Sequence, residues 1–91
     1  MVYVILVYDV NVSRVNEVRK YLRRYLYWTQ NSVFEGELSE IKLEKILYNL
    51  KKICNEKEDS IRVYVIRDKF FIKRVINIGI IKGGEPDLMI F

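Results

Sequence analysis

The sequence predicts an α+β domain in which strands are interrupted by two amphipathic helices. Three observations support this prediction. The first residues form an almost continuously apolar run, two later segments repeat apolar residues at helical spacing, and the segments between them are rich in β-branched and aromatic residues. The 91 residues, 51% of them hydrophobic, are enough for one compact domain and too few for two.

The first strand is expected at residues 2–8, where apolar and β-branched residues follow one another as in a strand buried on both faces. Asn11 and Ser13 offer turn and capping chemistry, and Ser13 is the better N-cap candidate. Apolar residues then recur at helical spacing, which predicts a helix over residues 13–25. The end of the first strand, at Asp9, therefore opens into a loop.

The middle of the chain changes period. Residues 27–30 and 32–38 fit two short strands, or one strand kinked near Asn31. Ser39 is then expected to cap a second helix. The apolar stripe of that helix consists of Leu43, Ile46, Leu47, Leu50 and Ile53 or Cys54. Residues 55–59 form a charged loop, and residues 61–66 alternate as the next strand.

A further β-like stretch covers residues 70–81 and is broken at Gly79. The resulting order, βαββαβ, is that of a ferredoxin-like sandwich with two helices on one face of an antiparallel sheet. We expect this domain over residues 1–82 and an extra strand in the tail, residues 83–91. The apolar end, residues 88–91, could dock on its own sheet or add a strand to a partner's edge.

The composition excludes several classes of chemistry. The chain has no histidine, so Ser-His and Cys-His mechanisms are excluded and catalysis would depend on carboxylates, tyrosines, lysines or a metal. Its single cysteine excludes an intramolecular disulfide, and zinc needs more thiol or imidazole ligands. No apolar run approaches the roughly 20 residues of a membrane-spanning helix, and we expect a cytoplasmic protein.

Asp9 is the sharpest candidate for chemistry. It lies at the end of an apolar strand that opens into a loop, a position where α/β proteins place reactive groups. Alternatively, its role could be limited to accepting backbone hydrogen bonds in the turn. One carboxylate is a poor magnesium site. In a twofold dimer, however, two copies of Asp9 could face each other and complete a site. Tyr8 points to the opposite face of the strand if the strand continues through Asp9, as a core or interface aromatic with its hydroxyl at the edge.

The first helix carries basic residues with only Glu17 of opposite sign. These residues are Arg14, Arg19, Lys20, Arg23 and Arg24. Such a stripe is either an ordinary solvated helix face or a phosphate-binding surface. The net charge of +4 is consistent with an anionic partner. Trp28 could stack on a base, although core packing is the default for most aromatic residues.

Two motifs make the chain recognisable. Val7-Tyr8-Asp9-Val10, followed after a basic helix by Gln30-Asn31-Ser32-Val33-Phe34-Glu35-Gly36-Glu37-Leu38, strongly resembles the CRISPR-associated Cas-two family. The resemblance covers essentially the whole chain. It implies a ferredoxin-like homodimer that works with the Cas-one integrase when new spacers are captured. It also implies a bridge that holds duplex DNA, and magnesium-dependent nuclease activity on RNA or duplex DNA in several members.

The resemblance also assigns roles to residues. Asp9 matches the acidic strand-end residue that binds metal, one from each subunit, and Tyr8 matches its neighbour at the catalytic centre. Arg14 falls early in the first helix, where the family tends to carry arginine, and Phe34 matches the second motif and could pack at the dimer interface. From the basic stripe, the candidates for nucleic-acid binding are Arg14, Arg19, Lys20 and Arg23. Two functions therefore compete, a Mg²⁺-dependent nuclease and a non-catalytic duplex-DNA scaffold. A toxin-like ribonuclease on the same fold is a third.

Overall fold

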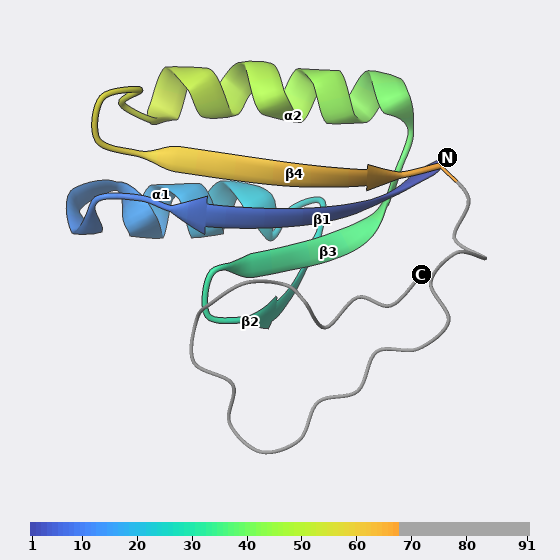
Figure 1. The fold of residues 1–91 in the computed structure, drawn as a ribbon, viewed down its shortest axis with the longest axis horizontal. Helices are drawn as coiled ribbons and strands as arrows, with labels where there is room; N and C mark the ends of the chain where they lie inside the picture. Colours follow the sequence, from blue (N-terminus) through green and yellow to red (C-terminus); the bar gives the residue numbers. More distant parts are fainter. Residues whose placement is uncertain (68–91) are drawn as a thin grey trace.

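The computed structural model describes residues 1–67 (Figure 1). The β-like stretch expected at 70–81, the domain limit at residue 82 and the tail strand at 83–91 lie outside the described residues. None of the helices in the described part is long and apolar enough to cross a membrane.

The described residues form a four-stranded antiparallel sheet and two helices in the predicted order. The elements are β1 (Val2–Asp9), α1 (Val12–Leu22), β2 (Tyr27–Gln30), β3 (Val33–Leu38), α2 (Glu40–Ile53) and β4 (Ser60–Ile66). The strands lie in the order β2-β3-β1-β4, so the first strand of the chain is central in this sheet. The βαββαβ order confirms the ferredoxin-like prediction.

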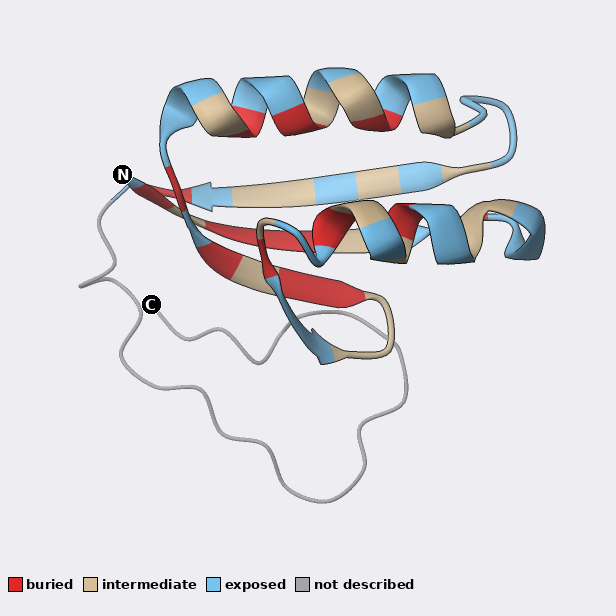
Figure 2. Ribbon diagram, turned by 180° about the vertical axis from the view of Figure 1, so that it is seen from behind, coloured by how far each residue is buried: buried red, intermediate tan, exposed pale blue. Residues whose placement is uncertain are grey.

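Both helices cover the same face of the sheet and bury their apolar stripes against it (Figure 2). Even-numbered residues of β1 point to this face because side chains alternate along a strand. The layer between sheet and helices includes Leu6 from β1, Leu22 from α1, Ile46 from α2 and Phe34 from β3. All four are fully buried, and burying a side chain of this kind contributes roughly 1.5–3 kcal/mol.

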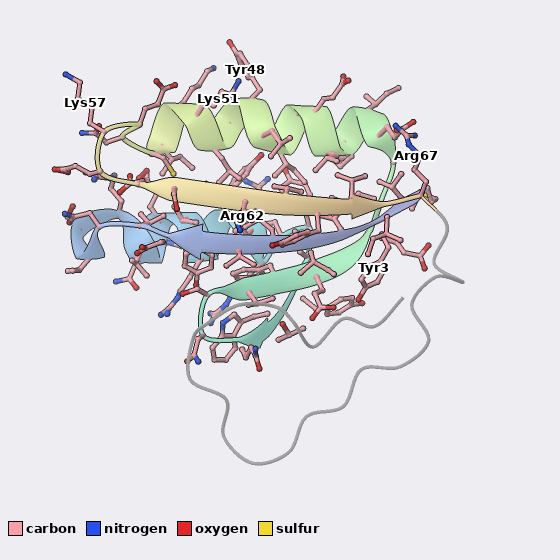
Figure 3. All side chains as sticks on the ribbon, viewed as in Figure 1. Tyr3, Tyr48, Lys51, Lys57, Arg62 and Arg67 are labelled. Carbon is pink, nitrogen blue, oxygen red and sulfur yellow. The ribbon has the colours of Figure 1, made fainter. Side chains whose placement is uncertain are left out.

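The other face of the sheet carries a second apolar cluster. Ile5, Val33 and Ile66 form its buried centre, and β1 is accordingly apolar on both faces, as the sequence predicted. At the far end of this face, Tyr3 donates a hydrogen bond to Glu35 at 2.9 Å (Figure 3). Burial and this hydrogen bond raise the pKa of the Tyr3 phenol to about 12.

The first helix differs from its predicted limits. It begins at Val12 after an Asn11 cap and ends at Leu22, whereas we expected Ser13 as the cap and an end near Tyr25. Asn11 caps the helix because its Oδ1 atom accepts hydrogen bonds from both the amide and the hydroxyl of Ser13. Residues 23–25 form a turn in which two successive amides bond back to the Leu22 carbonyl, which brings Leu26 into the core.

The second helix follows its prediction. Ser39 caps it by accepting a hydrogen bond from the Lys42 amide at 3.1 Å, and the helix ends at Ile53. Leu43, Ile46 and Leu50 are buried, while Leu47, Ile53 and Cys54 are half-buried against the same core. Between β2 and β3, Asn31 takes a positive φ of 29°, which explains the break in strand character predicted there.

Candidate metal and nucleic-acid site

Three connecting segments meet at one end of the sheet (Figure 1). The strand β1 ends there at Asp9, which lies opposite Ser60 at the start of β4. The turn between β2 and β3 reaches the same end, since the Tyr8 amide donates to the Ser32 carbonyl at 3.0 Å. Lys57 projects from the α2–β4 loop at this end (Figure 3). The sheet thus gathers Asp9 and three loops into one neighbourhood.

Asp9 is exposed, and its carboxylate forms no hydrogen bond or ion pair with any other residue of the 1–67 segment. As an odd-numbered residue of β1, it lies on the face of the sheet away from the helices. The strand before it is held on both sides, because β1 pairs with β3 and with β4. A rigid central strand therefore presents a carboxylate that is not used structurally.

The turn after Asp9 is stabilised by other residues. Asn11 caps α1, and the Asn11 amide donates to the Asp59 carboxylate at 2.9 Å. The sequence left open whether Asp9 only accepts hydrogen bonds in this turn. In the structure Asn11 and Asp59 perform that role, and Asp9 is left for other partners.

Asp59 was expected only as part of a charged loop, and it proves to be the main anchor of this end. Its side chain is 1% exposed and accepts from the Asn11 amide, the Asn55 amide at 2.8 Å, and Arg14. The Arg14 Nε and Nη2 atoms lie 2.7 and 3.0 Å from its two oxygens. We call this arrangement of Asn11, Arg14, Asn55 and Asp59 the Asp59 clasp.

The contacts of the Asp59 clasp change the pKa of the Asp59 carboxyl group. The Arg14 guanidinium, and after it the two backbone amides, hold the pKa of Asp59 well below its usual range although burial opposes this shift. Arg14 also pairs with Glu58 at 3.0 Å. Two carboxylates thus offset the charge of Arg14, which the sequence proposed as a phosphate ligand.

Tyr8 is a buried residue of the helix-side core. It is 3% exposed and its ring lies 5.9 Å from the ring of Phe34. Its hydroxyl donates to the Asn31 carbonyl at 3.0 Å and accepts from Arg19 Nε at 2.8 Å. Tyr8 and Asp9 therefore lie on opposite faces of the sheet, and the structure does not bring their side chains together.

The predicted basic stripe divides into two groups. Arg14 and Arg19 are engaged by Asp59 and Tyr8, whereas Lys20 and Arg23 are exposed. Within residues 1–67, no carboxylate lies within ion-pair distance of Lys20 or Arg23. These two side chains keep their charge available to an anion.

Two aromatic residues are placed differently from expectation. Phe34, which the resemblance placed at a dimer interface, is fully buried inside this chain because its strand directs it at the helices. Trp28, for which core packing was the default, is 49% exposed on the edge strand β2. The sequence held one signal for this exposure: in residues 27–30 two aromatic residues are followed by two polar ones, so apolar and polar residues do not alternate as in a half-buried strand.

The described residues contain no cluster of three or more potential metal-ligating side chains. A divalent cation at the end of β1 would find the Asp9 carboxylate, which accepts no hydrogen bond within residues 1–67. Mg²⁺ often uses one or two carboxylates together with substrate phosphates and water. The donor set is therefore compatible with Mg²⁺ if a second chain or a bound phosphate completes it.

Within residues 1–67, the fold and site define a small ferredoxin-like domain with an exposed carboxylate at the end of the central strand. Basic residues without an ion-pair partner in this segment lie on the first helix and just after it. The family model described as CRISPR associated protein Cas2 matches residues 1–74. This chain belongs to the Cas2 family.

Individual relatives agree with the family match. The chain is 54% identical over 83 residues to a protein of Archaeoglobus fulgidus named CRISPR-associated endoribonuclease Cas2 2, covering 91% of this chain and 89% of that one. It is 46% identical over 87 residues to CRISPR-associated endoribonuclease Cas2 of Methanocaldococcus jannaschii, covering 96% and 75%.

Solved structures show the same architecture. The crystal structure of Streptococcus pyogenes Cas2 at pH 6.5 superimposes with a TM-score of 0.74 at 35% identity, over 85% of this chain and 99% of that one. A second crystal structure of Cas2 gives a TM-score of 0.74 at 51% identity, over 84% and 86% of the two chains.

Proposed function

We propose that this protein is a homodimeric nucleic-acid-binding component of CRISPR adaptation that cleaves phosphodiester bonds through Asp9 of its two subunits. The observation that carries the proposal is the contrast between Asp9 and Asp59. One aspartate at this end is consumed by structural hydrogen bonds, whereas Asp9 is exposed and uncommitted. The names of the relatives, which include the word endoribonuclease, support phosphodiester chemistry.

Asp9 would hold Mg²⁺ together with Asp9 of a second copy, because one carboxylate is a sparse ligand set. A bound Mg²⁺ supplies an activated water and offsets charge on the scissile phosphate. The absence of histidine is compatible with this chemistry. Lys20 and Arg23 are the side chains best suited by charge to bind the nucleic-acid backbone away from the scissile phosphate, since neither has a carboxylate partner in residues 1–67.

In the cell, the dimer would act in the cytoplasm as a bridge between copies of the Cas-one integrase during spacer capture. The strength of the Cas2 family match supports this assignment. A scaffold needs the basic surface but not Asp9, whereas a nuclease needs both. One experiment therefore separates the two functions.

The experiment compares the wild-type protein with Asp9→Asn and with Glu44→Gln, an exposed carboxylate on α2 that serves as the matched control. Single-stranded RNA and duplex DNA are incubated with and without Mg²⁺, and binding is measured separately in EDTA. We expect Mg²⁺-dependent cleavage that falls at least about 100-fold in Asp9→Asn, the scale of losing a catalytic group, and is unchanged in Glu44→Gln. Binding in EDTA should survive in both variants.

Two other results would overturn the nuclease assignment. If Asp9→Asn cleaves as fast as the wild type, a different residue or a contaminating nuclease is responsible. If the wild-type protein binds duplex DNA but cuts neither substrate, the scaffold function replaces the nuclease. A Tyr8→Phe variant, checked for folding by circular dichroism, tests the role of the Tyr8 hydroxyl. If cleavage is retained, the hydroxyl has a structural role. If cleavage is lost in the folded variant, the hydroxyl takes part in the chemistry.

A further inference from the structure

Trp28 presents an aromatic surface beside basic side chains at the end of α1. It is 49% exposed, and the Arg23 guanidinium lies 5.9 Å from its ring centroid. A scattered exposed apolar residue needs no explanation. This one has a cation within cation–π range, and a planar ring next to a guanidinium is what nucleobase binding uses.

The orientation of the Trp28 ring is fixed. Its indole N–H donates to the Asn31 carbonyl at 2.8 Å, and the same carbonyl accepts from the buried Tyr8 hydroxyl. Asn31 itself is held in a tight turn with positive φ. The ring is therefore connected to the core through one carbonyl oxygen. A ring held in this way loses little conformational freedom when a second planar group stacks on it.

The basic residues at the end of α1 add positive charge beyond that of Arg23. Lys20, Arg23 and Arg24 are all exposed on or just after α1, and none has an ion-pair partner among the 67 described residues. Arg24 lies over the ring of Tyr25 at 5.5 Å, and Lys42 from α2 lies near the same ring at 5.3 Å. Pairs of a cation and an aromatic ring therefore occur at Trp28 on β2, at Tyr25 after the end of α1, and between Tyr25 and Lys42 at the start of α2.

Trp28 lies on the opposite face of the sheet from Asp9. It is the register partner of Phe34, whose side chain faces the helices, so Trp28 also projects to the helix side. The turn that holds the ring is nevertheless at the same end of the sheet as Asp9, because Ser32 bonds to the Tyr8 amide. A ligand at Trp28 is therefore distinct from one at Asp9.

We propose that Trp28 stacks on an unpaired nucleobase while Lys20 and Arg23 bind the phosphates that flank it. The ligand class is a single-stranded segment of nucleic acid, either a single strand or the unpaired end of a duplex. This inference rests on the proposed nucleic-acid binding of the chain but not on cleavage. Its tests are therefore made in EDTA.

The chain offers a direct reporter, because Trp28 is its only tryptophan. Intrinsic fluorescence is titrated with a single-stranded oligonucleotide and with an abasic oligonucleotide that has the same number of phosphates. Stacking should quench the emission with the base-containing strand and leave it nearly unchanged with the abasic strand. DNA and RNA versions of both strands show which sugar the site accepts.

A second measurement uses labelled oligonucleotides and fluorescence anisotropy. Trp28→Leu should weaken binding of the single strand about tenfold or more while changing binding of a blunt duplex less than about twofold. The matched control is Tyr48→Leu, because Tyr48 is 61% exposed on α2 and lies 4.4 Å from the Lys52 ammonium (Figure 3). Tyr48→Leu should bind the single strand like the wild type.

Several outcomes would overturn the inference. Equal quenching by the base-containing and abasic strands means that phosphates alone are bound near the ring. Equal loss in Trp28→Leu and Tyr48→Leu means that the surface is unspecific. Normal duplex binding with no effect of Trp28→Leu overturns the stacking site alone, whereas absence of binding to every strand and duplex overturns the proposed nucleic-acid function as well.

Discussion

Two aspartates lie at the same end of the sheet in opposite environments. The side chain of Asp59 is almost completely shielded from solvent and accepts hydrogen bonds from Arg14 and two backbone amides, whereas Asp9 is exposed and accepts none within the described segment. Their sequence surroundings do not reveal this difference. Asp9 stood out because it interrupts an apolar strand, while Asp59 looked like one of several acidic residues in a charged loop.

The Asp59 clasp predicts a pH dependence of stability. Folding lowers the pKa of Asp59, so its contribution is present above the pKa of the unfolded state, about 4, and is lost as the pH falls through the folded value. Asp59→Asn should therefore be less stable than the wild type at pH 7, and the difference should shrink steadily below about pH 4. Urea unfolding followed by circular dichroism between pH 7 and pH 2 measures this.

Glu58→Gln is the matched control for that measurement. Glu58 also pairs with Arg14, but its side chain is 49% exposed, and solvent screens a pair of this kind. We expect Glu58→Gln to follow the wild-type curve closely. Parallel curves for Asp59→Asn and the wild type at every pH would contradict the assignment of the clasp.

The two helices illustrate what local sequence can predict about an element. For α2, the cap at Ser39 and the apolar stripe agree with each other, and both were predicted correctly. For α1, the cap is Asn11 rather than Ser13 because the Asn11 amide is fixed by Asp59, which lies in the loop directly before β4. That contact joins residues 48 apart in the chain, and no local pattern contains it.

The Ser39 cap makes an element-level prediction. Ser39→Ala removes the acceptor for the Lys42 amide and should lower the free energy of unfolding by about 1 kcal/mol. Ser39→Asp restores an acceptor and should recover most of that stability, since Asp is as good an N-cap as Ser. Chemical denaturation measures both. Equal losses in the two variants would show that the hydroxyl matters for another reason.

For the whole molecule, the architecture could be predicted from the sequence, but which charged residues of the site form structural contacts and which remain exposed could not. The βαββαβ pattern and the family motifs predicted the architecture, and the Cas2 match confirms the family. Which basic residues remain free depended on partners in other elements. Arg14 is bound by Asp59 from the loop before β4 and Arg19 by Tyr8 of the central strand, which leaves Lys20, Arg23 and Arg24 without an ion-pair partner in residues 1–67.

The proposed pairing of Asp9 across a dimer can be measured by mixing subunits. In an equimolar mixture of wild-type and Asp9→Ala chains after subunit exchange, about one quarter of the dimers carry Asp9 on both sides. If both carboxylates are needed, the activity should fall to about a quarter of the pure wild type at equal total protein. A fall to only about three quarters would mean that one Asp9 per dimer is enough, and a fall to about half would mean that each Asp9 acts independently.

The Asp59 clasp also determines when the site is formed. Arg14 and Asp59 are 45 residues apart, so their contact closes most of the described chain into one loop. Closing a long loop costs entropy that only later contacts offset, and contacts between distant residues form late in folding. The strand β1 also pairs with β4, from Asp9 opposite Ser60 onward, and those residues are even further apart in the chain. The turn beside Asp9 is therefore tethered only when β4 joins the sheet, so the protein completes its fold and its site in the same late step.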